Sequence, residues 1–224
     1  MDRASQSDQG NSLRERLIDA GVDLVMTEGS ASLGLREIAR RAGVSHGAPR
    51  RYFPTHHALL SAIARRGFTE LAARFAAAAE GAGTPREQLR GLAGAFLDYA
   101  GECGGMFELM FRHDLLDSEA HASDTDADAP GGPRLRESTL PLFARLVELV
   151  AQDRAHRTET GTEPSYDSAP PPAALTAAAL WTNLHGIAVL RASGSLQLAF
   201  PGAGEGPDPL LTAVLDAHLG RVDA

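Results

Sequence analysis

The sequence contains no lysine, and all 21 of its basic residues are arginine. Its one cysteine, Cys103, excludes an intrachain disulfide framework and fits a reducing compartment such as the cytoplasm. Aromatic residues make up 5% of the chain, and no segment alternates apolar and polar residues as a half-buried strand does. The polar first dozen residues lack the apolar region of a secretory signal, and no apolar run reaches the ~18–20 residues of a membrane span. The composition therefore predicts a mostly helical cytoplasmic protein without a membrane segment.

Charge is distributed unevenly along the 224 residues. The whole chain has a formal net charge of −8, yet residues 1–66 carry 10 arginines against 7 acids. Between residues 30 and 66 there are seven arginines and a single acid, Glu37, which gives this segment a net charge of +6. An acidic protein with one compact basic segment is typical of a protein that binds a polyanion through one end. A merely solvated basic surface is the alternative interpretation.

The basic segment has the pattern of two short helices joined by a tight turn. Apolar residues recur at helical spacing over 35–42, and Gly43 then ends this helix, because glycine tolerates a positive φ. Ser45 follows, where its hydroxyl can cap the free N–H groups of a second helix over 46–52. A helix, a glycine-bearing turn and a second helix of this length make a helix-turn-helix. The second helix carries two arginines behind small residues, which suits insertion into the major groove of DNA.

Helical periodicity continues through most of the chain and predicts about nine helices. They span approximately 12–27, 35–42, 46–52, 55–79, 85–101, 105–117, 134–155, 173–191 and 207–221. Residues 1–11 are expected to form a disordered tail, and 118–133 and 157–172 are expected to form loose linkers, because acidic, small and proline residues dominate them. We therefore expect a helix-turn-helix domain at 12–66, whose last helix continues to about residue 79, and a larger helical domain at 80–224.

The segment LREIARRAGVSHGAPRRYFPTHHALLSAI, preceded by a capped helix, closely resembles the DNA-binding head of the TetR/AcrR family of transcriptional regulators. The resemblance covers about residues 12–66. A shorter segment, WTNLHGIAVL at 181–190, is similar to the tryptophan and His-Gly pattern of one branch of that family's C-terminal domains. The resemblance implies an all-α fold, with an N-terminal three-helix helix-turn-helix domain and a C-terminal helical domain for ligand binding and dimerisation. It implies a regulator of transcription rather than an enzyme, and no cofactor.

The resemblance also assigns DNA-binding roles to particular residues. They lie at the start of the helix at 35–42, in the recognition helix, and at the start of the helix at 55–79, where free N–H groups favour phosphate. The residues expected to contact DNA are Leu35, Arg36, Ser45, His46, Gly47, Ala48, Arg50, Arg51, Tyr52, Thr55 and His56. A dimer would place two recognition helices roughly 34 Å apart, so the expected partner is double-stranded operator DNA of palindromic sequence.

Four of these positions, or their neighbours, depart from the family pattern. Many members have lysine where His56 stands, so this phosphate contact is expected to be weaker or pH-dependent, because a free imidazole titrates near ~6.5. Pro49 would lie one turn inside the recognition helix, where it removes an N–H donor. Arg50 and Arg51 replace neutral side chains, and each is expected either to read guanine through two hydrogen bonds or to hold a phosphate.

The C-terminal half is expected to supply a dimer contact and a ligand pocket. The helices at 173–191 and 207–221 are apolar on more than one face, so each is buried in a core or against a partner. The resemblance implies that this pair of helices forms a homodimer, and that bulky side chains nearby line a cavity for a small apolar effector. The candidate ligand-binding residues are Phe96, Tyr99, Met106, Phe107, Met110, Phe111, Trp181, Asn183 and His185. Each is also explained by an ordinary place in a helical core.

The leading hypothesis is a repressor that an effector releases from its operator. Two alternative functions remain. One is an enzyme or small-molecule carrier with an incidental helix-turn-helix. That alternative requires clustered catalytic groups, and the C-terminal half shows none at a suitable spacing. The other is a sequence-independent DNA binder, which the acidic remainder of the chain disfavours.

Overall fold

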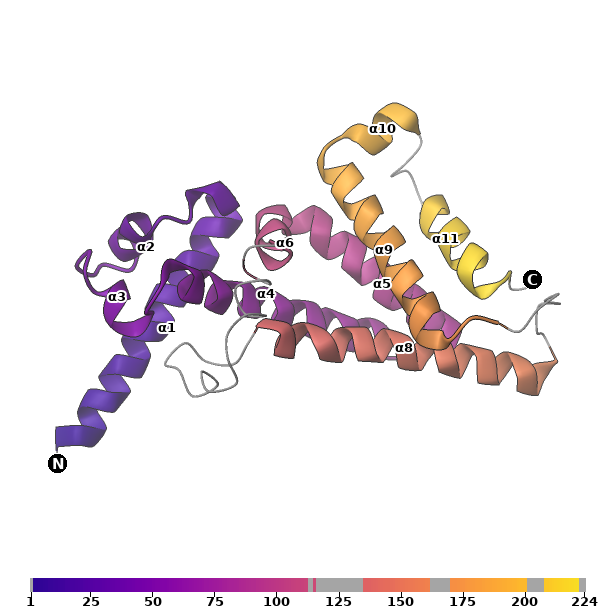
Figure 1. Cartoon of the computed structure of the whole chain (residues 1–224), viewed down its shortest axis with the longest axis horizontal. Coiled ribbons are helices and arrows are strands. Elements are labelled where there is room, and N and C mark those ends of the chain that lie inside the picture. Colours follow the sequence, from indigo (N-terminus) through magenta and orange to yellow (C-terminus); the bar gives the residue numbers. More distant parts are fainter. Residues whose placement is uncertain (1, 113–114, 116–134, 162–169, 201–207, 222–224) are drawn as a thin grey trace. The chain divides into compact units, whose positions relative to one another are not determined.

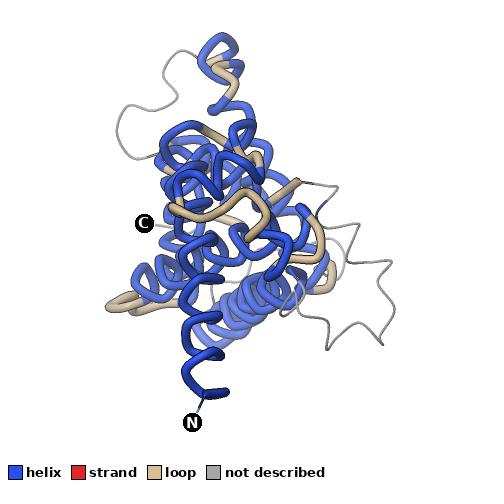
Figure 2. The backbone as a smooth tube through the Cα atoms, turned by 90° about the vertical axis from the view of Figure 1, so that its left-hand side faces the viewer, coloured by secondary structure: helices blue, strands red, loops and turns tan. Residues whose placement is uncertain are grey.

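The computed structural model describes residues 2–112, 115, 135–161, 170–200 and 208–221. The described residues form ten α-helices and one short 3-10 helix, with no strand among them (Figures 1 and 2). This confirms the all-α fold that the sequence predicts. The chain separates into two compact units, one made of Met1–Glu70 and Cys103–Thr139, the other of Leu71–Glu102 and Leu140–Ala224.

The first unit contains the helix-turn-helix. Its elements are α1 (Asp2–Glu28), η1 (Ser30–Ser32), α2 (Leu35–Arg41), α3 (Pro49–Tyr52), the first part of α4 (His56–Ala79) and α6 (Gly104–Met110). Its core holds fully buried side chains from α1, α2 and α4, among them Leu24, Ile38 and Ile63. Gly21 of α1 lies directly against Ile63, where a Cβ atom would overlap the isoleucine side chain, so glycine allows α1 and α4 to approach closely.

The N-terminal segment differs from its prediction. Helix α1 begins at Asp2, so the segment 1–11, predicted to be a disordered tail, is helical from its second residue onward. The prediction began the helix at a cap near residue 11, but an existing helix extends by one hydrogen bond per added residue at little cost. The segment contains no proline that would stop this extension.

The recognition helix is also shorter than predicted. Helix α3 begins at Pro49, and the residues before it form a turn in which the Ala48 N–H donates to the Ser45 carbonyl at 2.9 Å. Pro49 therefore occupies the first helical position, where its missing N–H costs nothing, and does not lie one turn inside. Ala48 is the N-cap and no side chain caps this helix, so the prediction that Ser45 caps it is wrong.

The second unit is built from the rest of α4, α5 (Pro85–Glu102), most of α8 (Leu135–Thr160), α9 (Ala173–Ala192), α10 (Ser195–Ala199) and α11 (Pro209–Leu219). Helix α5 packs against both α9 and α11, which also pack against each other (Figure 1). The buried faces of these helices follow the apolar periodicity of the sequence, with Phe96, Leu180 and Leu215 in the core.

Two helix ends and one additional helix differ from the prediction. Helix α8 continues to Thr160, so the first residues of the predicted linker at 157–172 are helical. Helix α6 ends at Met110 instead of continuing to 117, and α10 was not predicted. The predicted linker at 118–133 lies outside the described residues.

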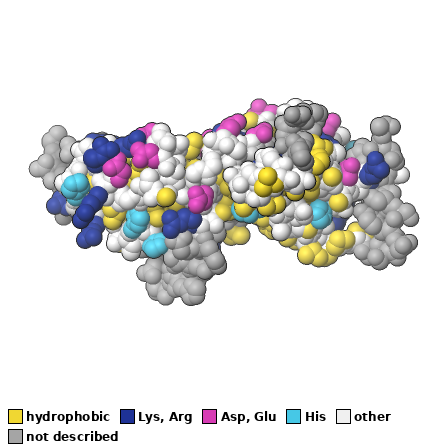
Figure 3. Space-filling view, turned by 90° about the horizontal axis from the view of Figure 1, so that it is seen from above, with side chains coloured by type: hydrophobic (Ala, Val, Ile, Leu, Met, Phe, Trp, Pro, Cys, Tyr) yellow, Lys and Arg dark blue, Asp and Glu magenta, His cyan; other side chains and the backbone are white. Residues whose placement is uncertain are grey.

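Helix α9 is apolar along its length, but much of it is exposed within the single chain. It is the one helix of the described residues that is long and apolar enough to cross a membrane, with a mean hydropathy of 1.4 and 33% of that window buried. The core helix of a globular protein meets the same criteria, and α9 packs along α5 and α11. Its apolar side chains Leu175, Val189 and Leu190 are 60%, 49% and 45% exposed, and Figure 3 shows hydrophobic side chains at the surface of this unit.

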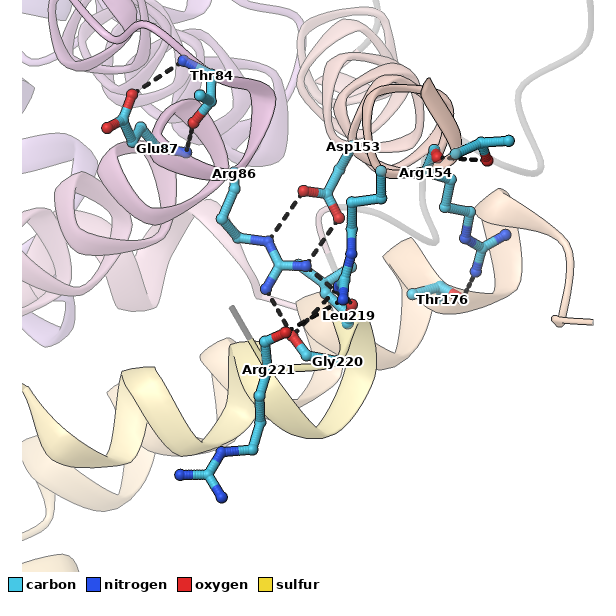
Figure 4. Close-up of polar contacts among 11 residues, drawn as sticks. Thr84, Arg86, Glu87, Asp153, Arg154, Thr176, Leu219, Gly220 and Arg221 are labelled. Atoms are coloured by element: carbon cyan, nitrogen blue, oxygen red, sulfur yellow. Dashed lines mark hydrogen bonds and ion pairs between the residues drawn. The ribbon is translucent and has the colours of Figure 1, made fainter. Parts of the chain in front are cut away.

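Helix α5 begins with a reciprocal cap. The Glu87 N–H donates to the Thr84 hydroxyl at 3.2 Å, while a Glu87 carboxylate oxygen accepts from the N–H groups of Thr84 at 2.9 Å and Gly83 at 2.8 Å (Figure 4). These bonds, above all the one from the Thr84 backbone, lower the pKa of Glu87. The cap therefore contributes fully to stability near neutral pH, and its contribution is lost as the pH falls through this lowered pKa.

A buried ion-pair network joins α5, α8 and the end of α11 (Figure 4). The Arg86 guanidinium donates to both carboxylate oxygens of Asp153, at 3.0 and 2.8 Å, and also to the carbonyls of Leu219 at 2.8 Å and Gly220 at 2.9 Å. Arg157 donates to the Leu219 carbonyl as well. The three charged residues are at most 8% exposed. The last carbonyls of α11 have no partners within the helix, so the two arginines complete its C-terminus and match the negative end of its dipole.

Replacing Asp153 by alanine is expected to lower the free energy of unfolding by about 3–5 kcal/mol, because the buried Arg86 loses its paired carboxylate. Urea denaturation at equal protein concentrations measures this change. Glu148→Ala is the control on the same helix, since Glu148 forms an exposed ion pair with Arg145 at 2.8 Å. This control is expected to cost about 1 kcal/mol or less. Equal losses in the two variants would contradict the importance of the buried network.

Candidate DNA-binding site

Three elements of the helix-turn-helix line one concave surface. It encloses about 610 Å³ and receives residues from the start of α2, from the turn and helix at α3, and from the start of α4. The lining residues are Gly34, Leu35, Arg36, His46, Gly47, Arg50 and His56. Six of these seven are residues predicted to contact DNA. The seventh, Gly34, was not among the predicted contacts. It is the N-cap of α2, and its position directly before the predicted helix is the signal by which the sequence could have identified it.

The other predicted DNA contacts neighbour these residues in the sequence and reach the surface. Ser45, Arg51 and Thr55 are exposed, while Ala48 and Tyr52 are half-buried. The Thr55 hydroxyl accepts from the Ala58 N–H at 3.0 Å, which caps the start of α4. Phe53, the residue after Tyr52, is buried in the core.

Six of the seven arginines of the basic segment divide into two groups. Arg40 pairs with Glu37, Arg41 with Asp23 and Glu28, and Arg66 with Glu15 and Asp19. The hydrogen bond from Arg40 holds the pKa of Glu37 below its usual value. Arg36, Arg50 and Arg51 form no hydrogen bond or ion pair with the described part of the chain. The net charge of +6 counted from the sequence therefore overstates the charge that is available to a polyanion.

His56 is tied to the turn that precedes α2. Its Nε2 atom lies 2.7 Å from the Leu33 carbonyl oxygen. Because a carbonyl oxygen only accepts, Nε2 must carry a hydrogen atom. This bond fixes the start of α4 beside the start of α2, and it leaves the ring's other nitrogen, Nδ1, for any outside ligand.

The predicted ligand-binding residues fall into both compact units. Tyr99, Phe96, Trp181, Asn183 and His185 lie on α5 and α9 in the second unit. The ring of Phe96 is 4.9 Å from that of Trp181 and 6.5 Å from that of His185, so these three side chains form one aromatic cluster. Asn183 instead bonds the His218 ring at 3.0 Å, and Tyr99 is buried beneath the Arg74 guanidinium, 4.9 Å from the ring centre.

The remaining ligand predictions lie on or directly after α6 in the first unit. The rings of Phe107 and Phe111 are 4.8 Å apart. Met106 and Met110 pack against Gly67 of α4, where an added Cβ would overlap their side chains. Met106, Phe107 and Met110 are thus part of the buried core of that unit, and Phe111 is half-buried beside Phe107.

His185 is the one residue of the aromatic cluster that titrates, and its partial burial lowers its pKa. The imidazole is therefore neutral near neutral pH, which suits an uncharged ligand better than an anion. Within the described residues, no three His, Cys, Asp or Glu side chains gather in a way that would hold a metal ion. Cys103 is buried at the start of α6.

Comparison with known families covers both parts of the chain. Residues 17–63 match the family described as bacterial regulatory proteins, tetR family. Residues 89–218, more than half of the chain, match the tetracyclin repressor-like C-terminal domain. The chain belongs to the TetR family. This membership confirms the prediction of a DNA-binding transcriptional regulator with an N-terminal helix-turn-helix, and it identifies the chain as a regulator and not an enzyme.

Similar proteins agree with this assignment. Over 79 residues, 35% of this chain, the sequence is 35% identical to the HTH-type transcriptional regulator BetI of Rhizobium meliloti, and the match spans 39% of that protein. A solved structure of a protein of unknown function from Rhodococcus sp. RHA1 is 28% identical, with a TM-score of 0.67 over 92% of this chain and 93% of that one. A transcriptional regulator from Rhodococcus sp. Rha1 is 25% identical, with a TM-score of 0.56 over 92% and 94% of the two chains.

A substitution at Gly47 would test whether DNA approaches the concave surface closely. Its φ is not positive, and a Cβ atom added there meets no atom within 4 Å, so the fold does not require glycine. Gly47→Ala is expected to leave the unfolding temperature unchanged or raised. If DNA packs against this point, it should weaken operator binding by about 1–3 kcal/mol, as overpacking does in a core. Gly94→Ala on α5, which also meets open space, is the control for both measurements. Equal operator affinity in the two variants would contradict close approach.

Proposed function

We propose that this TetR-family protein is a homodimeric repressor that leaves a palindromic operator when a small apolar effector binds its C-terminal domain. The observation that carries the proposal is the concave surface of the helix-turn-helix. Arg36 and Arg50 line it, and neither side chain forms a hydrogen bond or ion pair within the described residues. Such a regulator acts where the bacterial chromosome lies, so the proposed compartment is the cytoplasm.

Direct reading of bases is proposed for α3. Arg50 and Arg51 are exposed on this helix, and Pro49 fixes its first turn from the buried side. A guanidinium group donates two parallel hydrogen bonds to the major-groove edge of guanine, or it holds a phosphate oxygen. The proposed roles of Arg36 and Thr55 are phosphate contacts, which set register without reading sequence.

Selection of binding sites from a random DNA pool is the experiment that tests this function. We expect a palindrome whose affinity falls steeply as salt rises. On that duplex, Arg50→Ala combined with Arg51→Ala is expected to abolish specific binding while the unfolding temperature stays the same. Each lost phosphate contact should reduce the slope of log affinity against log salt by about 0.9.

Arg40→Ala is the matched control, because Glu37 already neutralises this exposed arginine. It should leave the affinity and the salt slope nearly unchanged. Recovery of no common sequence would favour a sequence-independent DNA binder. Specific binding that survives the double substitution would exclude α3 as the recognition helix.

The proposed dimer forms through α9 and α11. Leu175, Thr182 and Val189 follow one another at intervals of seven residues and are all exposed, so they form one stripe along α9. On α11 the exposed positions Ala213 and Ala217 are four residues apart and small, which permits close helix contact. A two-fold axis would bring these faces of two copies together and present two recognition helices to one duplex.

Thr182→Arg is expected to convert the dimer to a monomer, because it places a charge in the middle of the α9 stripe. Thr182 is exposed and bonds only within its own helix, so the fold of each chain should persist. Light scattering after gel filtration measures the mass, and operator binding should weaken together with it. Ala76→Arg, at an exposed position of α4, is the control. A Thr182→Arg protein that keeps the mass of the parent would place the dimer contact elsewhere.

The proposed effector site includes the cluster of Phe96, Trp181 and His185 on α5 and α9. Aromatic walls with a neutral imidazole favour a small, uncharged, largely apolar molecule. The other candidates stay predicted ligand residues: Tyr99, Asn183, Met106, Phe107, Met110 and Phe111. To release the operator, the effector must bind more tightly to a form of the dimer whose recognition helices do not fit the operator.

A further inference from the structure

We propose that His56 is a proton-dependent ligand of an operator phosphate, so that the protein takes up protons as it binds DNA. The proposal rests on the DNA-binding function proposed above and adds a regulation of that same site.

The bond between His56 and Leu33 determines which ring nitrogen can meet DNA. Nε2 donates to the Leu33 carbonyl at 2.7 Å, and this bond is available to the ring in both of its protonation states. In the described part of the chain, no protein atom bonds Nδ1. The ring is half-buried and lines the concave surface from the start of α4.

The surroundings of the ring favour an anion. Arg36, Arg50 and His46 line the same concave surface, and no carboxylate is among its lining residues. Helix α4 is 24 residues long, and its N-terminus presents the positive end of its dipole next to His56. The ring of His57, the next residue of α4, lies 6.5 Å from that of His56. A phosphate oxygen in this concavity would therefore meet cationic groups and the ring.

The ring meets that phosphate differently in its two protonation states. When His56 is neutral, Nδ1 carries a lone pair, because the hydrogen is on Nε2, and a lone pair repels a phosphate oxygen. When the ring is protonated, Nδ1 carries a hydrogen and donates a charge-assisted bond to the phosphate. No bond to Leu33 has to break in either state. Protonation therefore adds both a positive charge and a donor at a fixed position.

Proton uptake follows from this difference. A phosphodiester stays ionised throughout the neutral range, and the guanidinium groups of Arg36 and Arg50 stay charged, so neither supplies a pH dependence. A free imidazole titrates near ~6.5, so the protonated fraction of a histidine changes across the physiological range. The rival sources of the same dependence are His46 and His57, and the experiment must separate the three rings.

The test is the operator dissociation constant, measured by fluorescence anisotropy from pH 5.8 to 8.2 at constant ionic strength. We expect the affinity to fall as the pH rises, by up to about tenfold per pH unit for each ring engaged and about a hundredfold when both rings of a dimer are engaged. His56→Lys supplies a permanent charge and should bind tightly with no dependence on pH. His56→Gln keeps a donor for the Leu33 carbonyl but no titrating group, and it should bind weakly with no dependence on pH.

His46→Gln and His57→Gln are the matched controls, and both should keep the slope of the parent protein. Thermal unfolding of every variant at both pH limits confirms that each remains folded. A parent protein with a flat pH profile, a His56→Gln protein that keeps the slope, or a His46→Gln protein that loses it would overturn the proposal. A failed operator selection would instead count against the proposed function. The same titration on an unselected duplex would then still test His56, because phosphate contacts do not depend on base sequence.

Discussion

The second unit depends on how the C-terminus of α11 is held. Eleven residues of helix would be marginal alone, and α11 ends in carbonyls that the helix itself does not satisfy. Arg86 and Arg157 donate to the Leu219 carbonyl, and Asp153 of α8 pairs with Arg86. The carboxylate of Asp153 thus offsets the buried Arg86 guanidinium, and the negative end of the helix dipole favours both arginines. Together with the buried side chains Leu211 and Leu215, this arrangement orients α11 beside α9 and so defines the surface that we propose for dimerisation.

Because the chain has no lysine, arginine serves both in the buried core and at the surface. The burial and the neighbours of each arginine determine its role. A guanidinium presents five N–H donors in a rigid plane, so Arg86 satisfies a carboxylate and two carbonyls at once, which an ammonium group does less well. At the surface of the helix-turn-helix, acids on α1 and α2 hold Arg40 and Arg41. The positions of these acids therefore determine which arginines remain available to bind an anion. A count of charges along the sequence does not identify those arginines.

Periodicity predicted the all-α fold, the helix-turn-helix and the long helices, because a stripe of apolar residues is a local property of the sequence. The start of α3 was misplaced because Ser45 and Pro49 are both start signals, and the backbone turn at 46–48 decides between them. The pairing of Arg86 with Asp153 joins residues 67 positions apart, and no local pattern encodes it. The candidate ligand residues show the same limit. Their spacing places them on apolar faces, but it does not say which of two compact units each face enters.

The histidine at position 56 is best understood in a chain that has no lysine. The concave surface is lined by arginines, whose charge is constant at any pH a cell reaches, and by two histidines. A lysine at this position would bind phosphate strongly and at all times. An imidazole that already donates one nitrogen to the Leu33 carbonyl keeps the geometry of the contact constant and lets only its charge vary. In the interface that we propose, the arginines set a baseline affinity for DNA, and the ring adds a contribution that depends on proton concentration without any movement of the helices.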